Sequence, residues 1–96
     1  MKHGNVQSLR EAIDEVLNTY QLKERINAVS LEQNWELLFG KTIARYTRKI
    51  FISDHKLFLT IESAPLREEL MYSKTKMIAI INERIAENFI TEIIIR

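Results

Sequence analysis

Five cations gather in one short segment of this chain, between residues 41 and 56. The segment contains Lys41, Arg45, Arg48, Lys49 and Lys56 with Asp54 as its single acid, so its net charge is +4. Residues 1–40 carry −2, residues 57–96 carry −1, and the whole chain carries +1. A local basic patch can bind phosphate even when the protein is nearly neutral. The segment therefore predicts contact with a polyanion, although a cluster of this kind can equally be ordinary solvated surface.

Two aromatic residues belong to the same region. Residues 48–53 and 57–62 alternate at period two around Asp54–His55, which predicts a β-hairpin with Phe51 opposite Phe58. The core face of this hairpin would carry Ile50, Ile52, Leu57, Leu59 and Ile61, and the other face Lys49, Phe51, Phe58, Thr60 and Glu62. Paired phenylalanines beside cations can stack unpaired bases while the cations contact phosphates. The alternative is that the first helix covers this face and the pair is core.

The hairpin turn itself departs from the usual pattern. A two-residue turn of the primed type prefers Asn-Gly or Asp-Gly, so His55 is a poor second residue after Asp54. A longer loop around the same centre would keep the same pairing of strands.

A second basic candidate is Ser73-Lys74-Thr75-Lys76, which interrupts the apolar pattern of a long predicted helix. Lys74 and Lys76, together with two hydroxyls, could hold a backbone phosphate. An ordinary solvated helix face explains the same residues.

Motifs for catalysis are weak. Gly40-Lys41-Thr42 looks like the end of a phosphate loop, but that motif needs an earlier glycine where Trp35 stands. His3 and His55 lie in a terminus and a turn without neighbouring ligands, and the chain has no cysteine. Neighbouring glutamates in a helix diverge by about 100°, so Glu68 and Glu69 are not a catalytic pair. We therefore expect a protein that is not an enzyme and that takes no cofactor or metal.

Composition predicts one small globular domain spanning residues 1–96. The chain is 46% hydrophobic and 28% charged, with two Gly and one Pro. It has no apolar stretch long enough for a membrane span, and Met1-Lys2-His3-Gly4 leads into a polar segment rather than a signal peptide. The lack of cysteine fits a reducing compartment. We expect a cytoplasmic protein without membrane contact.

The order of predicted elements gives the fold class. A capping box at Ser8 and Glu11 opens a helix over about 9–20, a short helix follows over 21–28, and Ser30 with Gln33 opens a third through about Ala44. In that third helix Trp35 is expected in the core, and Gly40 marks either a helix break or a close backbone approach. After the hairpin, Ser63 caps a long helix that reaches about Glu87, with Asn88 as its left-handed cap. A last strand covers 89–96. The class is α+β with a three-stranded sheet.

Several residues in this order resemble a known family. Trp35, Gly40, Ile43-Ala44 and Thr47 follow the pattern W-x-x-x-x-G-x-x-I-A-x-x-T, and Leu57-Phe58-Leu59, Ser63–Leu70 and Ile80–Glu83 follow in turn. This set resembles the DciA family, long described as a domain of unknown function, and in particular its short form in Bacteroidetes. The resemblance covers roughly residues 5–96. It implies a KH-like α-β-β-α-β core with additional N-terminal helices.

The resemblance also implies a function. Members of the family act in the bacterial cytoplasm as accessory or loading factors for the replicative helicase DnaB and bind DNA, especially single-stranded or branched forms. We therefore expect a DNA-binding helicase accessory factor. The residues leave RNA open as a ligand, and they leave open a different class of protein. That rival is an adaptor or homodimer that acts through the hairpin face or through the apolar last strand at a sheet edge.

Overall fold

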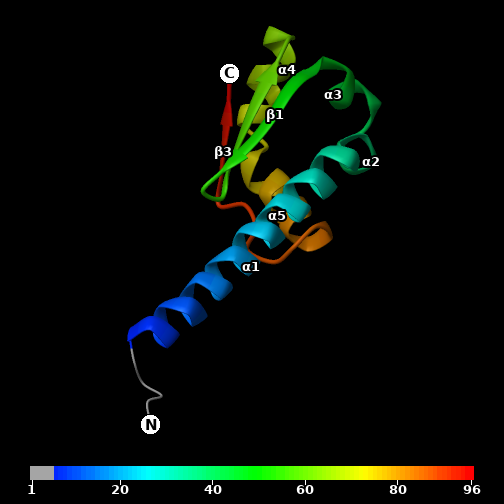
Figure 1. Ribbon diagram of the computed structural model, residues 1–96. Helices are drawn as coiled ribbons and strands as arrows, with labels where there is room; N and C mark the ends of the chain where they lie inside the picture. Colours follow the sequence, from blue (N-terminus) through cyan, green and yellow to red (C-terminus); the bar gives the residue numbers. More distant parts are fainter. Residues whose placement is uncertain (1–5) are drawn as a thin grey trace.

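A long N-terminal helix leads into a small body of helices and one sheet (Figure 1). The structure is a computed structural model that describes residues 6–96, so the expectations about Met1 to Gly4, including His3, fall outside the described residues. The elements, in chain order, are α1 (Val6–Gln33), α2 (Trp35–Phe39), α3 (Lys41–Tyr46), β1 (Thr47–Ser53), β2 (Lys56–Ile61), α4 (Ala64–Met71), α5 (Lys74–Arg84) and β3 (Glu92–Ile95). The molecule measures 64 × 20 × 20 Å because α1 extends away from the body.

The sheet has three strands in the order β1-β2-β3, which confirms the α+β class. β1 and β2 pair antiparallel with Phe51 opposite Phe58 and Ile52 opposite Leu57, so the predicted register is confirmed. β3 runs parallel to β2, with Ile94 next to Phe58. β2 is therefore central, and β3 lies at an edge of the sheet.

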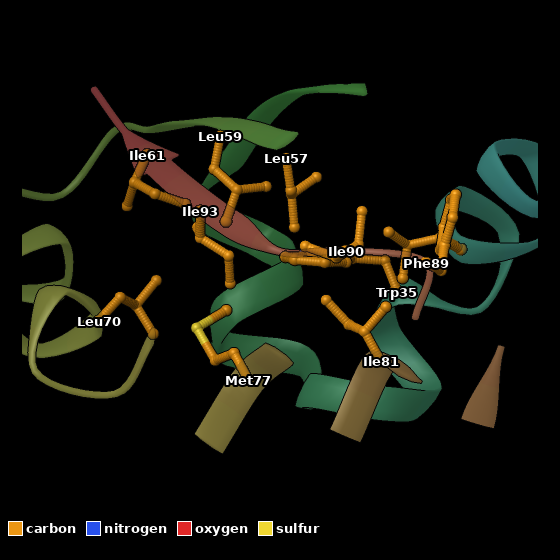
Figure 2. Close-up of a cluster of buried hydrophobic side chains, with 11 residues drawn as sticks. Trp35, Leu57, Leu59, Ile61, Leu70, Met77, Ile81, Phe89, Ile90 and Ile93 are labelled. Carbon is orange, nitrogen blue, oxygen red and sulfur yellow. The ribbon is translucent and has the colours of Figure 1, made fainter. Parts of the chain in front are cut away.

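One face of the sheet forms the core together with the helices. Leu57, Leu59 and Ile61 of β2 are at most 1% exposed, because this strand is central and its odd-numbered side chains all point inward. Figure 2 shows these side chains opposite Leu70, Met77 and Ile81 of α4 and α5. Trp35 is also in this cluster, as predicted, and its indole N–H donates to the Thr47 hydroxyl at 3.0 Å.

The three predicted N-terminal helices are divided differently in the structure. α1 runs without interruption from Val6 to Gln33, so the separate helix over 21–28 and the helix start at Ser30 were wrong. No Gly or Pro occurs in this stretch, and Ser and Asn are tolerated inside a helix that packs on a core at its end. The chain turns at Asn34 instead, just before Trp35 enters the core.

Gly40 breaks the helix that was expected to continue through Ala44. Its backbone has φ +92° and ψ 166°, a conformation that essentially only glycine adopts. An added Cβ would meet no atom within 4 Å, so the backbone conformation, and not close packing, requires glycine here. Of the two readings of Gly40, the helix break is confirmed.

The predicted helix from Ser63 to Glu87 is two helices. The Ser63 hydroxyl accepts from the Leu66 N–H at 3.3 Å and Pro65 lies in the first turn, as expected, but α4 ends at Met71. The break falls at Tyr72–Ser73. After buried Leu70, the next positions on the same face of a continuous helix would be Ser73 and Lys74, and neither is apolar. α5 then ends at Arg84. Asn88 has the expected positive φ of 58°, yet it lies in the following loop and is not the helix cap.

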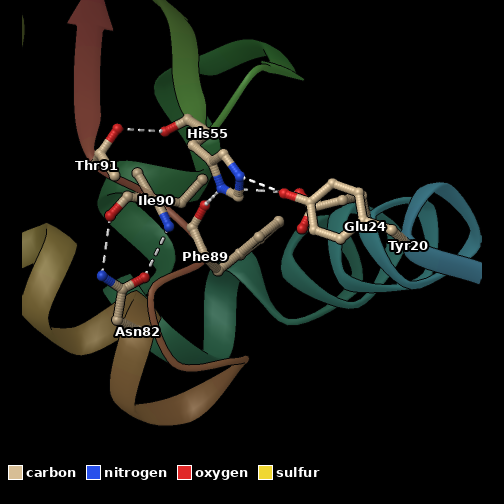
Figure 3. A network of polar contacts seen from close by, with 7 residues as sticks. All are labelled: Tyr20, Glu24, His55, Asn82, Phe89, Ile90 and Thr91. Atoms are coloured by element: carbon tan, nitrogen blue, oxygen red, sulfur yellow. Dashed lines mark hydrogen bonds and ion pairs between the residues drawn. The ribbon is translucent and has the colours of Figure 1, made fainter. Parts of the chain in front are cut away.

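Polar contacts hold the hairpin turn and the loop before β3 (Figure 3). Asp54 and His55 both have positive φ, as a primed turn requires. His55 Nδ1–H donates to the Phe89 carbonyl at 2.7 Å, and its Nε2 accepts from the Tyr20 hydroxyl at 2.5 Å. These tertiary contacts retain a residue that is locally unfavourable in the turn.

The last strand is shorter than predicted. Phe89 and Ile90 are buried but lie outside β3. The reason is that the Asn82 side chain forms hydrogen bonds with both the N–H and the carbonyl of Ile90. The Asn82 amide donates to the Ile90 carbonyl at 2.9 Å and accepts from the Ile90 N–H at 2.8 Å. The side chain of α5 therefore replaces a strand partner at this point.

We predict that Gly40→Ala destabilises the fold by about 1–3 kcal/mol, because an L side chain is strained at this φ and ψ. Urea unfolding measures the change. A synthetic chain with D-alanine at the same position adopts positive φ readily, so it should match the wild type. An equal loss in both chains would show that the site rejects bulk rather than handedness.

We predict that Asn82→Ala lowers the free energy of unfolding by about 2–4 kcal/mol, because it leaves the N–H and the carbonyl of buried Ile90 without a partner. The neighbouring exposed residue gives a control, Glu83→Ala, which should stay within about 0.5 kcal/mol of wild type. Thermal or urea unfolding followed by circular dichroism compares the two variants. Equal stabilities would refute a structural role for the Asn82 contacts.

Candidate nucleic-acid interface

The outer face of the sheet is open, and it gathers four of the predicted site residues. Phe51 is 53% exposed and Phe58 is half-buried, and neither belongs to the core cluster. Their ring centroids lie 5.7 Å apart at an interplanar angle of 44°. Lys49 and Lys56 lie on the same face, since they alternate with the inward residues of β1 and β2. The alternative in which the first helix covers this face was wrong.

Arg96 completes this face, and sequence reasoning missed it. Its guanidinium carbon lies 5.3 Å from the centroid of the Phe58 ring, within the range of a cation–π contact. The residue follows β3, and its N–H donates to the Leu59 carbonyl at 2.8 Å, which fixes it beside β2. The signal was available only through strand order, because parallel pairing of β3 with β2 sets Arg96 next to the aromatic pair.

Arg48 lies at an irregularity of β1. The register with β2 shifts between Thr47 and Lys49, so Arg48 is the extra residue of a bulge. Its guanidinium donates to a Glu62 carboxylate oxygen at 2.8 Å, with side chains 70% and 52% exposed. A pair this exposed contributes little to stability, and a polyanion can compete for the arginine. Among the described residues Lys49 makes no ion pair, so it is the freer cation.

We call the set Arg48, Lys49, Phe51, Lys56, Phe58 and Arg96 the open sheet face. Its four cations are accompanied by Glu62 and by Glu92, which is next to Lys56 in the register, so the face carries a net charge of +2. The aromatic pair lies between the cations. This arrangement combines aromatic rings, on which bases can stack, with positive charge for a phosphate backbone.

Other predicted site residues lie in the helical layer, away from the open sheet face. Lys41 at the start of α3 and Lys76 of α5 line a cleft of about 410 Å³, together with Ser73 and Glu69. Lys74 is half-buried at the start of α5, and Arg45 is exposed on α3. The structure thus divides the predicted cations into two groups. The helical cleft has an acid among its lining residues and its lysines come from different helices.

Within residues 6–96, no cluster of His, Cys, Asp or Glu could hold a metal ion. His55 is a partner of the Phe89 carbonyl and the Tyr20 hydroxyl, and Glu24 lies 3.9 Å from its Nδ1. No helix in that same stretch is both long and apolar enough to span a bilayer.

Comparisons with known proteins agree with the resemblance seen in the sequence. The family model described as "Dna[CI] antecedent, DciA" matches residues 8–95. A UPF0232 protein of Corynebacterium glutamicum (strain R) is 39% identical over 60 residues, which cover 62% of this chain. The matched part spans only 34% of that relative's length. Among solved structures none matches this chain, so the KH-like character of the core stays a prediction. Since the family model covers nearly all of the sequence, the chain belongs to the DciA family.

Proposed function

We propose that this protein is a non-enzymatic accessory factor of the replicative helicase that binds DNA through the open sheet face. Membership of the DciA family implies a role related to loading of the DnaB helicase. The observation that supports DNA binding is the pair of exposed Phe51 and half-buried Phe58 beside Lys49, Lys56 and Arg96. In this proposal the protein partner is the replicative helicase, and the nucleic-acid ligand is single-stranded or branched DNA.

The chemistry of the open sheet face favours a single strand over a duplex. An aromatic pair can stack only with bases that are unpaired, since the bases of a duplex are already stacked on one another. Unpaired DNA is also the state in which a helicase must be loaded. RNA carries the same bases and phosphates, and a competition assay distinguishes the two.

The cations of the helical cleft are a second set in this proposal. Lys41 and Lys76 line this cleft, and Arg45 and Lys74 lie on the same helices, α3 and α5. The Glu69 carboxylate beside Lys41 and Lys76 weakens the attraction for phosphate, so we assign the main contact to the sheet.

We predict that the protein binds labelled single-stranded DNA. Phe51→Ala should weaken binding by about tenfold, since a stacked base contributes about 1–3 kcal/mol. Lys49→Glu should also weaken binding by about tenfold, because it removes a phosphate contact. Fluorescence anisotropy across a series of salt concentrations measures both effects. Lys49→Glu should also reduce the slope of log K against log salt by about 0.7, because one phosphate contact is lost. Phe51→Ala should leave that slope unchanged.

Matched controls come from elsewhere on the surface. Lys23→Glu on α1 makes the same change of charge at an exposed lysine, and Tyr72→Ala removes an aromatic ring that is 86% exposed. Both should bind as the wild type does. If Lys23→Glu weakened binding as much as Lys49→Glu, the attraction would depend on net charge and the open sheet face would lose its role. No binding at low salt would refute DNA binding altogether.

We predict further that the purified protein co-elutes with the replicative helicase of the same organism in size-exclusion chromatography. Lys49→Glu and Phe51→Ala should retain this association, since they change the DNA surface alone. Loss of both activities in the same variants would contradict separate surfaces for the helicase and for DNA.

A further inference from the structure

The free part of α1 carries an exposed apolar stripe, and at the end of this stripe Tyr20 contacts His55 of the body. Every residue from Val6 to Lys23 is exposed. The stripe consists of Val6, Leu9, Ile13, Val16, Leu17 and Tyr20, which are from 49% to 70% exposed. A contiguous apolar surface of this kind on a soluble protein marks an interaction site.

The spacing of the stripe is that of a coiled-coil seam. Val6, Leu9, Ile13, Val16 and Tyr20 are separated by three, four, three and four residues, which is the a/d pattern of a heptad repeat. Glu11, Asp14 and Glu15 lie off the seam, whereas Lys23 occupies its next position after Tyr20. The sequence is therefore suited to pairing with another helix rather than with a flat surface.

The free part of α1 gains little stability from packing, because its side chains are exposed. The contacts of α1 with the body begin at Tyr20, which meets His55, and reach Leu31, which is fully buried. The preceding turns, from Val6 to about Thr19, have no core beneath them. The segment continues a helix that is already formed at its packed end, and a second helix would add the apolar burial that these turns lack.

We propose that α1 pairs with α1 of a second copy of this chain in antiparallel orientation. The side chains that pack on the body, at Glu24, Ala28 and Leu31, continue the same helix face as the stripe. In a parallel pair both bodies would need the space directly above the seam. An antiparallel pair places the bodies at opposite ends of the seam, which keeps them apart.

The antiparallel register follows from the stripe. With Ile13 facing Val16 of the second copy, Leu9 faces Tyr20, and the pattern repeats by the two-fold symmetry. Six side chains that each bury roughly 100 Å² would give an interface of about 1,200 Å² in total, the lower limit of specific association. The second copy is thus sufficient as the occupant, and the dimer should be reversible rather than obligate.

The oligomeric state tests this proposal, with a control that the helix itself provides. Ile13→Asp places a charge on the seam, whereas Leu22→Asp changes a residue half a turn around the same helix, at nearly equal exposure of 52% against 50%. Sedimentation equilibrium of the whole chain should give a dimer for wild type and for Leu22→Asp. For Ile13→Asp the dissociation constant should rise by about a hundredfold.

The other outcomes overturn the proposal. They are a wild type that stays monomeric at concentrations near 1 mM, a dimer that survives Ile13→Asp, and a dimer that Leu22→Asp disrupts. A partner protein on the stripe would appear as a monomer of the pure chain. Circular dichroism of both variants shows whether the body remains folded.

Cross-linking tests the orientation, since the chain has no cysteine of its own. Ala12→Cys and Thr19→Cys lie beside the seam, and the antiparallel register sets each opposite the other. A mixture of the two variants should therefore form a disulfide-linked dimer under mild oxidation, and neither alone should do so. Linked dimers of Ala12→Cys alone would indicate a parallel pair and contradict the proposal.

Discussion

The one-sidedness of the central strand is the constraint on which the rest of the structure depends. β2 sends Leu57, Leu59 and Ile61 into the core and Lys56, Phe58 and Thr60 outward. Because the period of a strand is two, a slip of one residue would bury the cations and expose the leucines. Pairing on both sides extends the same division to β1 and β3. The sheet therefore has one apolar face, which the helices cover, and one face with aromatic rings and cations, which stays open.

Alternation and turn chemistry made this part of the fold predictable. The register of the hairpin, the inward face, the Ser63 cap and the burial of Trp35 were predicted from the local pattern, whereas the break at Gly40 was one of two open readings in a helix expected to continue through Ala44. Elements set by distant partners were not predicted. The break at Tyr72–Ser73 lacks Gly or Pro, and the shortened β3 depends on Asn82, eight residues before Ile90.

The candidate site divides along the same line. Phe51 and Phe58 could be paired from the register alone, but whether a helix covered them depended on the course of α1. That helix has no break signal, so it continues past the point where two shorter helices were expected and leaves the sheet open. Arg96 was out of reach for a similar reason, since a parallel edge strand brings the last residue against Phe58. The cations of the basic segment 41–56 lie on two different surfaces, the open sheet face and the helical layer.

The central claim is that the open sheet face, and not the helical cleft, meets the single strand. Titration of a short unlabelled oligonucleotide into ¹⁵N-labelled protein, followed by amide chemical shifts, tests it most directly. The account predicts the largest shifts at Lys49, Phe51, Phe58 and Arg96, with little change around Lys41 and Lys76. Shifts confined to α3 and the start of α5 would contradict it.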